Sequence, residues 1–273
     1  MKIKKVGIVL KQDSEESRQI GLELATWLQD RSIDASIDQI SPDLDLVIIL
    51  GGDGTLLHVA CQASRFQIPV VGVNLGSLGF LTEVSVTNRY EALEKILAGS
   101  VVIEDRLMLK TRICQGESGT SEWSYALNDV VISKGNIDRL ARMEAWADDE
   151  FITSYRADGL IFSTPTGSTA YNLSAGGPII HPEMHSIMLT PICPFMLESR
   201  PVLLPHTVRL ITRVVGQADD IKVIVDGRST FDMSDGEHLE VMAAEHPLRL
   251  VCSPHKGYFE ILRSKLNWGG RTI

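Results

Sequence analysis

The spacing of hydrophobic residues changes near residue 101, and this change constrains the fold more than any other feature of the 273-residue chain. Before it, short apolar runs at residues 5–10, 44–50 and 68–73 alternate with segments of helical periodicity. After it, short β-type runs follow one another until a helix-like segment at residues 258–266. Alternating strands and helices are typical of a parallel α/β sheet, whereas consecutive short strands with turn signals are typical of a β sandwich.

We therefore predict two domains. Residues 1–100 form a Rossmann-like, three-layer α/β domain, and residues 101–255 form an all-β sandwich. The segment 256–273 returns to the first domain. The strands expected in the second domain are residues 107–113, 125–133, 142–147, 151–156, 160–163, 208–215, 221–225, 238–244 and 248–252.

The charge balance excludes several classes of partner. The chain carries 26 Lys+Arg against 35 Asp+Glu, a net charge of −9, so it lacks the basic surface that nucleic acids and anionic membranes require. A hydrophobic content of 44% is enough for a packed core. The four cysteines show no C-x-x-C spacing and no disulfide pattern, and no run has the apolar density of a membrane span. These features predict a soluble, cytoplasmic protein.

A glycine-rich turn follows the apolar run at residues 44–50 and leads into a helix-compatible segment. Backbone amides at the start of a helix, together with the helix dipole, favour phosphate. Asp53 is the unusual member, because a carboxylate repels phosphate unless a metal ion or a proton-transfer role offsets the cost. The turn therefore suggests catalysis, and the alternative is a simple helix cap. The predicted phosphate loop comprises Gly51, Gly52, Gly54 and Thr55.

Two further stretches carry polar groups. Residues 164–178 are dense in hydroxyls and glycines and include Tyr171, which suits a polar ligand with a ring, although ordinary turns have similar composition. The pair Asn128-Asp129 interrupts an apolar strand and indicates either a site or a bulge. His181 and His185 lie four apart without an obvious third ligand, so we predict no protein metal site.

These three markers, GGDG at residues 51–54, Asn128-Asp129 and TPTGSTAY at residues 164–171, stand in the order found in the NAD kinase family, which the chain resembles. The GGDG loop alone also occurs in 6-phosphofructokinases and in diacylglycerol and sphingosine kinases. The similarity extends to residues 72–81 and 155–159 and covers most of the chain. It implies the family fold, an N-terminal α/β domain followed by a β sandwich.

The resemblance implies transfer of the γ-phosphoryl group of ATP to the 2′-hydroxyl of the adenosine ribose of NAD, giving NADP. Asp53 would orient that hydroxyl and accept its proton late, while Mg²⁺ would neutralise the phosphates. The family also implies a homodimer or homotetramer with a shared NAD site. The alternatives are a catalytically silent dinucleotide-binding regulator and a lipid kinase that shares the GGDG loop.

The resemblance also assigns individual residues. Asn128 and Asp129 match the pair that binds the NAD adenosine, and Tyr171 matches the ring contact of the adenine pocket. Asp129 is shorter than the Glu of many members, and Arg228 stands where some members have Gln. The set predicted to bind NAD is Asp53, Gly54, His58, Asn128, Asp129, Arg139, Arg156, Asp158, Thr166, Thr169, Ala170, Tyr171, Asn172, Leu173, Ser174 and Arg228.

Overall fold

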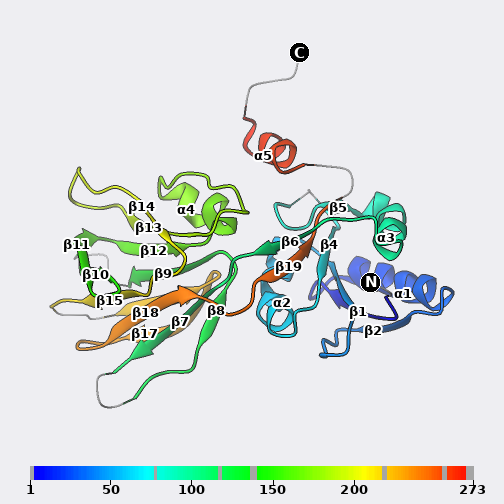
Figure 1. Cartoon of the computed structure of the whole chain (residues 1–273), viewed down its shortest axis with the longest axis horizontal. Coiled ribbons are helices and arrows are strands. Elements are labelled where there is room, and N and C mark those ends of the chain that lie inside the picture. Colours follow the sequence, from blue (N-terminus) through cyan, green and yellow to red (C-terminus); the bar gives the residue numbers. More distant parts are fainter. Residues whose placement is uncertain are drawn as a thin grey trace. The chain divides into compact units, whose positions relative to one another are not determined.

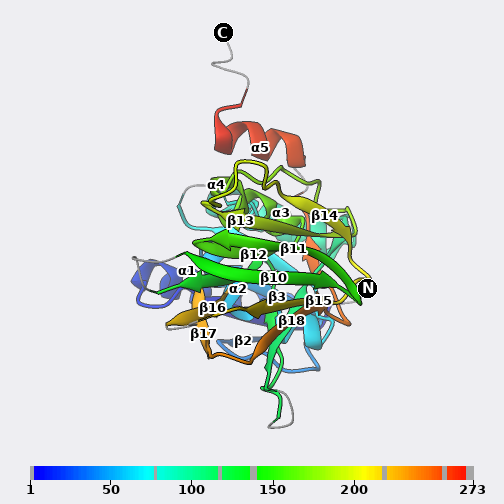
Figure 2. The ribbon, with the colours of Figure 1, turned by 90° about the vertical axis from the view of Figure 1, so that its left-hand side faces the viewer.

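A computed structural model describes residues 3–76, 79–115, 119–135, 140–216, 220–253 and 257–268 (Figures 1 and 2). It divides into two compact units, each described here by itself. The first consists of Met1–Asp105 with Leu248–Ile273, and the second of Arg106–Pro247. No helix in the described ranges is both long and apolar enough to cross a membrane.

The first unit is built on one sheet with the strand order β2-β1-β3-β4-β19-β6, and β5 pairs with β4. Strands β1 to β5 and β19 join their neighbours in parallel wherever the register is defined. The strands are β1 (Lys5–Leu10), β2 (Asp34–Ile37), β3 (Leu46–Leu50), β4 (Val70–Asn74), β5 (Val84–Ser85), β6 (Ile103–Arg106) and β19 (Leu248–Val251). The helices are α1 (Glu15–Gln29), α2 (Asp53–Arg65), α3 (Arg89–Leu97) and α5 (Tyr258–Leu266), with a 3₁₀ turn η1 at Val86–Asn88.

Helices cover both faces of this sheet. Leu24 of α1 and Leu93 of α3 belong to one buried cluster with Ile48 of β3. Val47 and Ile49, on the opposite side of the pleat, are also fully buried, and β3 contacts α2. A strand buried on both faces reads as a continuous apolar run, which is the pattern at β3. The three-layer α/β architecture is confirmed.

One strand lies in a different unit from the one expected. The sequence placed residues 248–252 in the β domain, but β19 pairs in parallel with β4, where Leu250 lies opposite Val70. Its buried side chains complete the α/β sheet, so the unit boundaries fall at residues 105 and 247, and not at 100 and 255. The error arose because a short apolar run does not reveal which sheet it will join.

The second unit is a β sandwich of two six-stranded sheets, one with the order β11-β10-β15-β18-β7-β8 and the other β14-β13-β12-β9-β16-β17. The strands of the first are β7 (Leu109–Cys114), β8 (Ser124–Ala126), β10 (Ala141–Ala147), β11 (Glu150–Ala157), β15 (Leu210–Val214) and β18 (His238–Ala243). Those of the second are β9 (Asp129–Lys134), β12 (Gly159–Ser163), β13 (Ser186–Ile192), β14 (Val202–Pro205), β16 (Ile221–Val225) and β17 (Arg228–Met233). Adjacent strands are antiparallel in both sheets.

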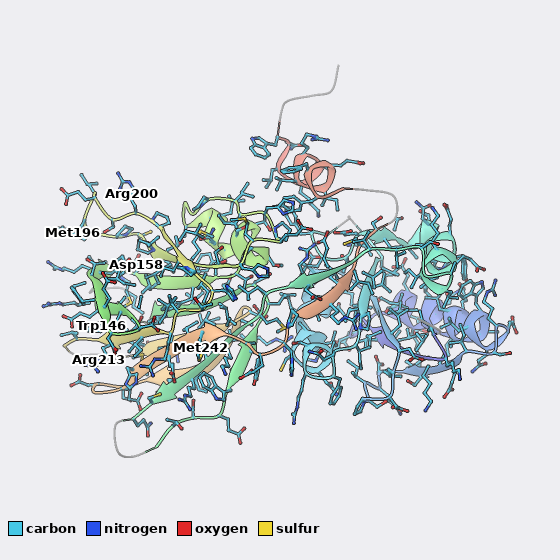
Figure 3. All side chains as sticks on the ribbon, viewed as in Figure 1. Trp146, Asp158, Met196, Arg200, Arg213 and Met242 are labelled. Carbon is cyan, nitrogen blue, oxygen red and sulfur yellow. The ribbon has the colours of Figure 1, made fainter. Side chains whose placement is uncertain are left out.

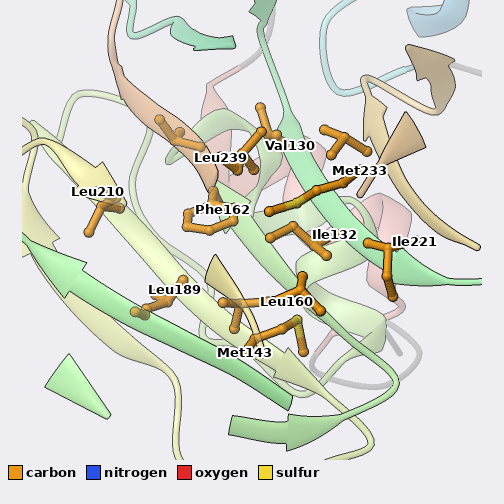
Figure 4. Packing of buried hydrophobic residues seen from close by; sticks show 14 of the residues in the cluster. Val130, Ile132, Met143, Leu160, Phe162, Leu189, Leu210, Ile221, Met233 and Leu239 are labelled. Atoms are coloured by element: carbon orange, nitrogen blue, oxygen red, sulfur yellow. The ribbon is translucent and has the colours of Figure 1, made fainter. Parts of the chain in front are cut away.

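Side chains from both sheets meet in one core (Figure 4). Met143 and Leu239 come from the first sheet, and Val130, Leu160 and Phe162 from the second. The core residues of a strand alternate along it, as expected for a sandwich. In β9, β12 and β13 the residues between them, Val131, Ile161 and Met188, are buried as well, so these strands are covered on both faces. The sandwich was predicted from the succession of short strands and is confirmed.

The sequence reading missed some strands and merged two others. It did not predict β13, β14 or β17, because their apolar residues are mixed with proline, serine or charged residues. It treated residues 125–133 as one strand, whereas the structure ends β8 at Ala126 and begins β9 at Asp129. The turn between them contains Leu127 and Asn128, so the polar pair marks a real break in the strand.

Candidate functional site

The predicted phosphate loop of the first unit connects β3 to α2. Gly52 is the N-cap residue of α2, and the carboxylate-bearing Asp53 is its first helical residue. A Cβ atom on Gly51 would lie 2.4 Å from the Thr55 hydroxyl, so the tight turn itself requires that glycine. A Cβ atom on Gly52 or Gly54 would meet nothing within 4 Å. The chain does not need those two glycines for its own packing, and they leave open space at a helix N-terminus suited to phosphate.

The Asp53 carboxylate is bound by a second glycine-containing turn, which follows β4. Oδ2 accepts a hydrogen bond from the Phe80 amide at 2.8 Å. Oδ1 accepts three, from the amides of Leu81 and Thr82 and from the Thr82 hydroxyl, each at 3.0 Å. The Asp53 side chain therefore does not cap its own helix, which was the alternative interpretation. It connects the turn after β3 to the turn after β4.

This arrangement fixes the carboxylate and leaves part of it available. A carboxylate offers about four lone-pair sites, and Oδ2 uses only one with the donors described here. A Cβ atom on Gly79 would lie 2.0 Å from Asp53 Oδ1, so only glycine fits beside the carboxylate. Asn74 supports the same turn, because its Nδ2 donates to the Thr82 hydroxyl at 2.8 Å. Asp53 can thus accept one further hydrogen bond without losing its anchors.

The other predicted residues of this unit lie on α2. Gly54 and His58 are both exposed, and a spacing of four residues places them on one face of the helix. Thr55 is half-buried, with its hydroxyl next to Gly51. Asp53, Gly54 and His58 are thus available together near the helix N-terminus.

In the second unit, Asn128 and Asp129 lie where β9 begins. The Leu127 amide donates to Asp226 Oδ2 at 2.8 Å, and the Asn128 and Asp129 amides donate to Asp226 Oδ1 at 2.8 and 3.1 Å. In return, the Asp226 amide donates to the Asp129 carbonyl oxygen at 3.0 Å. The turn that carries the predicted pair is therefore held by a residue almost one hundred positions later in the chain.

Asp129 is an acid in an unfavourable environment. Its side chain is 5% exposed. Burial, and after it the neighbouring Asp226 carboxylate, raise the pKa of Asp129 from its usual 3.8 to about 7. Burial also raises the pKa of Asp226, against the opposing effect of its three amide donors and of Arg228. Because the three amide donors stabilise the ionised form of Asp226, we assign the negative charge to Asp226 and the proton to Asp129. A buried acid that titrates near neutrality is typical of a functional site.

The segment at residues 164–174 packs directly on this turn. It contains a 3₁₀ helix η3 (Thr166–Thr169) and one helical turn α4 (Tyr171–Ser174). The Thr164 hydroxyl donates to the Leu127 carbonyl oxygen and accepts from the Gly167 amide. A Cβ atom on Gly167 would lie 2.0 Å from the Asn128 carbonyl oxygen. The fold thus brings together two of the three sequence markers.

The predicted residues of this segment fall into two groups. Tyr171 and Ser174 are exposed, and Thr169, Ala170 and Leu173 are half-buried, so all five are accessible. Thr166 is 8% exposed, and its hydroxyl has no hydrogen-bond partner among the described residues.

Asn172 differs from the rest of the segment because it is fully buried. Its amide nitrogen donates to the carbonyl oxygens of Ser168 and Pro178, and its carbonyl oxygen accepts from the Thr190 hydroxyl. Its side chain therefore supports the shape of the segment, and the expectation that it binds a ligand directly does not fit this conformation.

The remaining predicted residues lie apart from that segment. Asp158, labelled in Figure 3, follows β11. It forms an ion pair with Lys134 at 2.6 Å. Arg156 is exposed, and its guanidinium lies 5.2 Å from the centre of the Phe195 ring. Arg228 is exposed at the tip of the β16–β17 hairpin. Arg139 lies outside the described residues.

Sequence reasoning missed the residues that support the site. It assigned no role to Asp226 or Thr82, and Gly79 appeared only within the family-like stretch at residues 72–81. Their partners are distant in sequence, so no local pattern identified them. Among the described residues, no group of three or more His, Cys, Asp or Glu side chains could hold a metal ion.

The fold and these two sets of residues are those of the nucleotide-binding class of proteins, with a predicted phosphate loop in the α/β unit. The polar residues 164–174 of the β sandwich form the predicted ligand segment, called the pocket segment below. Comparisons with known proteins assign both units to a single family. Residues 33–101 match the model of the ATP-NAD kinase N-terminal domain, and residues 127–253 match that of the ATP-NAD kinase C-terminal domain.

Relatives of similar length agree. The chain is 42% identical to an NAD kinase of Trichlorobacter lovleyi, over 98% of this chain and 100% of that protein. It is 43% identical to an NAD kinase of Heliobacterium modesticaldum, over 97% and 99%. Yeast NADH kinase, solved in complex with NADH, superposes with a TM-score of 0.90 at 27% identity and covers 100% of this chain and 90% of that one. The fold is also that of an Archaeoglobus fulgidus NAD kinase, with a TM-score of 0.77 at 24% identity, covering 97% of this chain and 100% of that one. The chain belongs to the NAD kinase family.

Proposed function

We propose that the protein is an ATP-dependent NAD kinase, which transfers the γ-phosphoryl group of ATP to the 2′-hydroxyl of the adenosine ribose of NAD and yields NADP. The observation that carries this proposal is the Asp53 carboxylate, fixed by four donors at a glycine-rich helix N-terminus with acceptor capacity to spare. Membership of the NAD kinase family and the full-length relatives named NAD kinase support it.

The chemistry needs positioning more than a strong base. Phosphoryl transfer passes through a loose transition state in which little bond to the nucleophile has formed, so the attacking hydroxyl keeps its proton until late. The available lone pair of Asp53 Oδ2 orients the hydroxyl and takes that proton. The amides at the start of α2 bind phosphate oxygens. Mg²⁺ bound to the ATP phosphates would neutralise part of their charge.

The second unit supplies the contacts to the adenosine half of NAD. Asn128 offers its side-chain amide, Tyr171 its exposed ring, and Thr166 a buried hydroxyl that still lacks a partner among the described residues. Asp129, protonated near neutral pH, can donate as well as accept a hydrogen bond. This combination suits a base and a ribose, which need both donors and acceptors around an aromatic surface.

The two alternative functions have less support. A lipid kinase would share only the GGDG loop, whereas here the sandwich and its Asn128-Asp129 turn match the family as well. A silent dinucleotide binder would not need the Asp53 carboxylate, whose four anchors and close fit against Gly79 hold a negative charge where phosphate binds.

We also propose that the enzyme is a cytoplasmic homodimer or homotetramer. Its four cysteines are thiols and form no disulfide, as expected of a reducing compartment. The exposed Arg156 and the half-buried Asp158 belong to the set that the family resemblance places, in part, across a subunit interface. Sedimentation of the active enzyme as a monomer would overturn the proposed assembly.

The test of function combines two steps. Purified protein is incubated with NAD, ATP and Mg²⁺, and NADP is measured with an NADP-specific dehydrogenase. We expect NADP from the wild type and a rate lower by about 10²- to 10⁴-fold from Asp53→Asn. Asp34→Asn, which changes an exposed carboxylate on the edge strand β2, is the matched control. No NADP from folded wild type that still binds NAD would favour the silent binder. Full activity of Asp53→Asn would remove Asp53 from the mechanism.

A further inference from the structure

The tip of the β16–β17 hairpin carries a residue with an unusual set of contacts. Val225 pairs with Arg228, so Asp226 and Gly227 form a two-residue turn. Both have positive φ, 46° and 77°, as a type I′ turn requires. Asparagine or aspartate is favoured at the first position for its backbone conformation alone. The turn therefore needs a residue of this shape at 226, but it does not need a charge.

The Asp226 carboxylate is used outside its own turn. It accepts three amide hydrogen bonds, those of Leu127, Asn128 and Asp129, between 2.8 and 3.1 Å. Hydrogen bonds to an ionised acceptor are about twice as strong as neutral ones. Leu127 and Asn128 lie between β8 and β9, and the pairing of β9 with β12 begins only at Asp129. Asp226 thus accepts the hydrogen bonds that a neighbouring strand would accept within a sheet.

The same turn is in contact with the pocket segment. The Thr164 hydroxyl donates to the Leu127 carbonyl oxygen, and the Thr164 amide donates to the Asn128 carbonyl oxygen at 2.9 Å. Gly167 approaches that carbonyl so closely that no side chain fits. A displacement of residues 127–129 would therefore move the segment that carries Thr166 and Tyr171.

The proximity of the two buried acids Asp129 and Asp226 lowers the stability of the folded protein. Burial makes ionisation of both Asp129 and Asp226 less favourable, and the Asp226 carboxylate opposes ionisation of Asp129 further. Arg228 is the charged group that opposes this effect at Asp226. Acids with strongly perturbed pKa values cluster at functional sites. A neutral residue at 226 would avoid the repulsion but would lose the ionised acceptor.

We propose that Asp226 is a positioning residue for the dinucleotide: its carboxylate holds the turn at residues 127–129, and through Thr164 and Gly167 the pocket segment, in the conformation that binds NAD. This inference rests on the proposed function, because it assumes that the second unit binds NAD. Asp226 itself acts through the backbone of the turn and need not touch the substrate.

Asp226→Asn is the discriminating variant. Asparagine tolerates the positive φ of the turn, so the hairpin is preserved. Its oxygen can still accept from Asn128 and Asp129, but its NH₂ group faces the Leu127 amide, where two donors repel. The matched control is Asp235→Asn, an exposed aspartate in the second Asp-Gly turn of the same unit.

We expect Asp226→Asn to weaken NAD binding, measured calorimetrically without ATP, by about tenfold or more. The KM of Asp226→Asn for NAD should rise by the same factor as the dissociation constant, and its KM for ATP should stay within about twofold of the wild-type value. Asp235→Asn should have wild-type values of both. Unchanged NAD affinity in folded Asp226→Asn would overturn the inference. Equal rises in both KM values would indicate a general structural defect and would also overturn it.

Two outcomes need separate readouts. If Asp226→Asn does not fold, hydrogen exchange in the wild type decides, because the amides of residues 127–129 should exchange as slowly as those of β9, and exchange at the rate of an exposed loop would contradict the proposal. If the wild type makes no NADP, the proposed function fails, but calorimetry of NAD binding to both proteins still tests the positioning role.

Discussion

Replacement of Asp129 by Asn should remove the contribution of this residue to the pH dependence of the free energy of unfolding of the β sandwich. The carboxyl group is buried next to Asp226, and its pKa is raised from its usual 3.8 to about 7. An acid with a higher pKa in the folded protein than in the unfolded chain holds its proton more tightly when folded. The free energy of unfolding therefore falls as pH rises from about 4 to about 7.

The size of this effect follows from the two pKa values. With 3.8 in the unfolded chain and about 7 in the folded protein, the contribution of Asp129 to the free energy of unfolding is lower at pH 8 than at pH 5 by about 2.5 kcal/mol. An amide does not titrate, so Asp129→Asn should lack this decrease. The variant should thus gain about 2.5 kcal/mol relative to the wild type between pH 5 and pH 8, whatever its stability at pH 5.

Urea denaturation measures the difference. Replacing Trp27 and Trp268 by Phe in both proteins leaves Trp123 and Trp146 as fluorescent reporters of the second unit. Asp149→Asn, at an exposed turn of the same unit, is the control and should follow the wild type at every pH. If Asp129→Asn and the wild type show the same pH dependence to within about 0.5 kcal/mol, the buried-acid account of Asp129 is wrong.

Three further substitutions test the packing around the site. Gly79→Ala would place a Cβ atom 2.0 Å from Asp53 Oδ1 and should lower kcat by on the order of 10²-fold, measured by NADP formation, with NAD affinity unchanged. Gly167→Ala would press on the Asn128 carbonyl oxygen and should destabilise the second unit by about 3 kcal/mol in urea; a loss below about 1 kcal/mol would show that the segment can move away. Phe162→Ala empties a fully buried position of the sandwich core and should cost about 3–5 kcal/mol by the same measurement, whereas an effect near zero would contradict the core described here.

Much of the fold could be predicted because its signals are local. The apolar run of β3, the glycine turn and the helical spacing of α2 lie within about twenty consecutive residues, and each follows from backbone preference and hydrophobic period. The change of period near residue 101 likewise separated an α/β region from a β region. The same reasoning failed at β19, because its four residues could join either sheet and only packing selected β4.

The candidate site likewise has some features that local sequence predicts and others that depend on tertiary packing. The candidate residues were identified from local pattern alone: Asp53 at the start of a helix, and Asn128-Asp129 at a break in a strand. Their surroundings emerged only from the folded structure. Asp53 is anchored by amides 27 to 29 residues away, and the Asn128-Asp129 turn by Asp226, 97 to 99 residues away. Hydrophobic period and turn propensity act between near neighbours in the chain. The partners of a buried carboxylate are set by which strands pair, and that choice depends on the packing of the whole core.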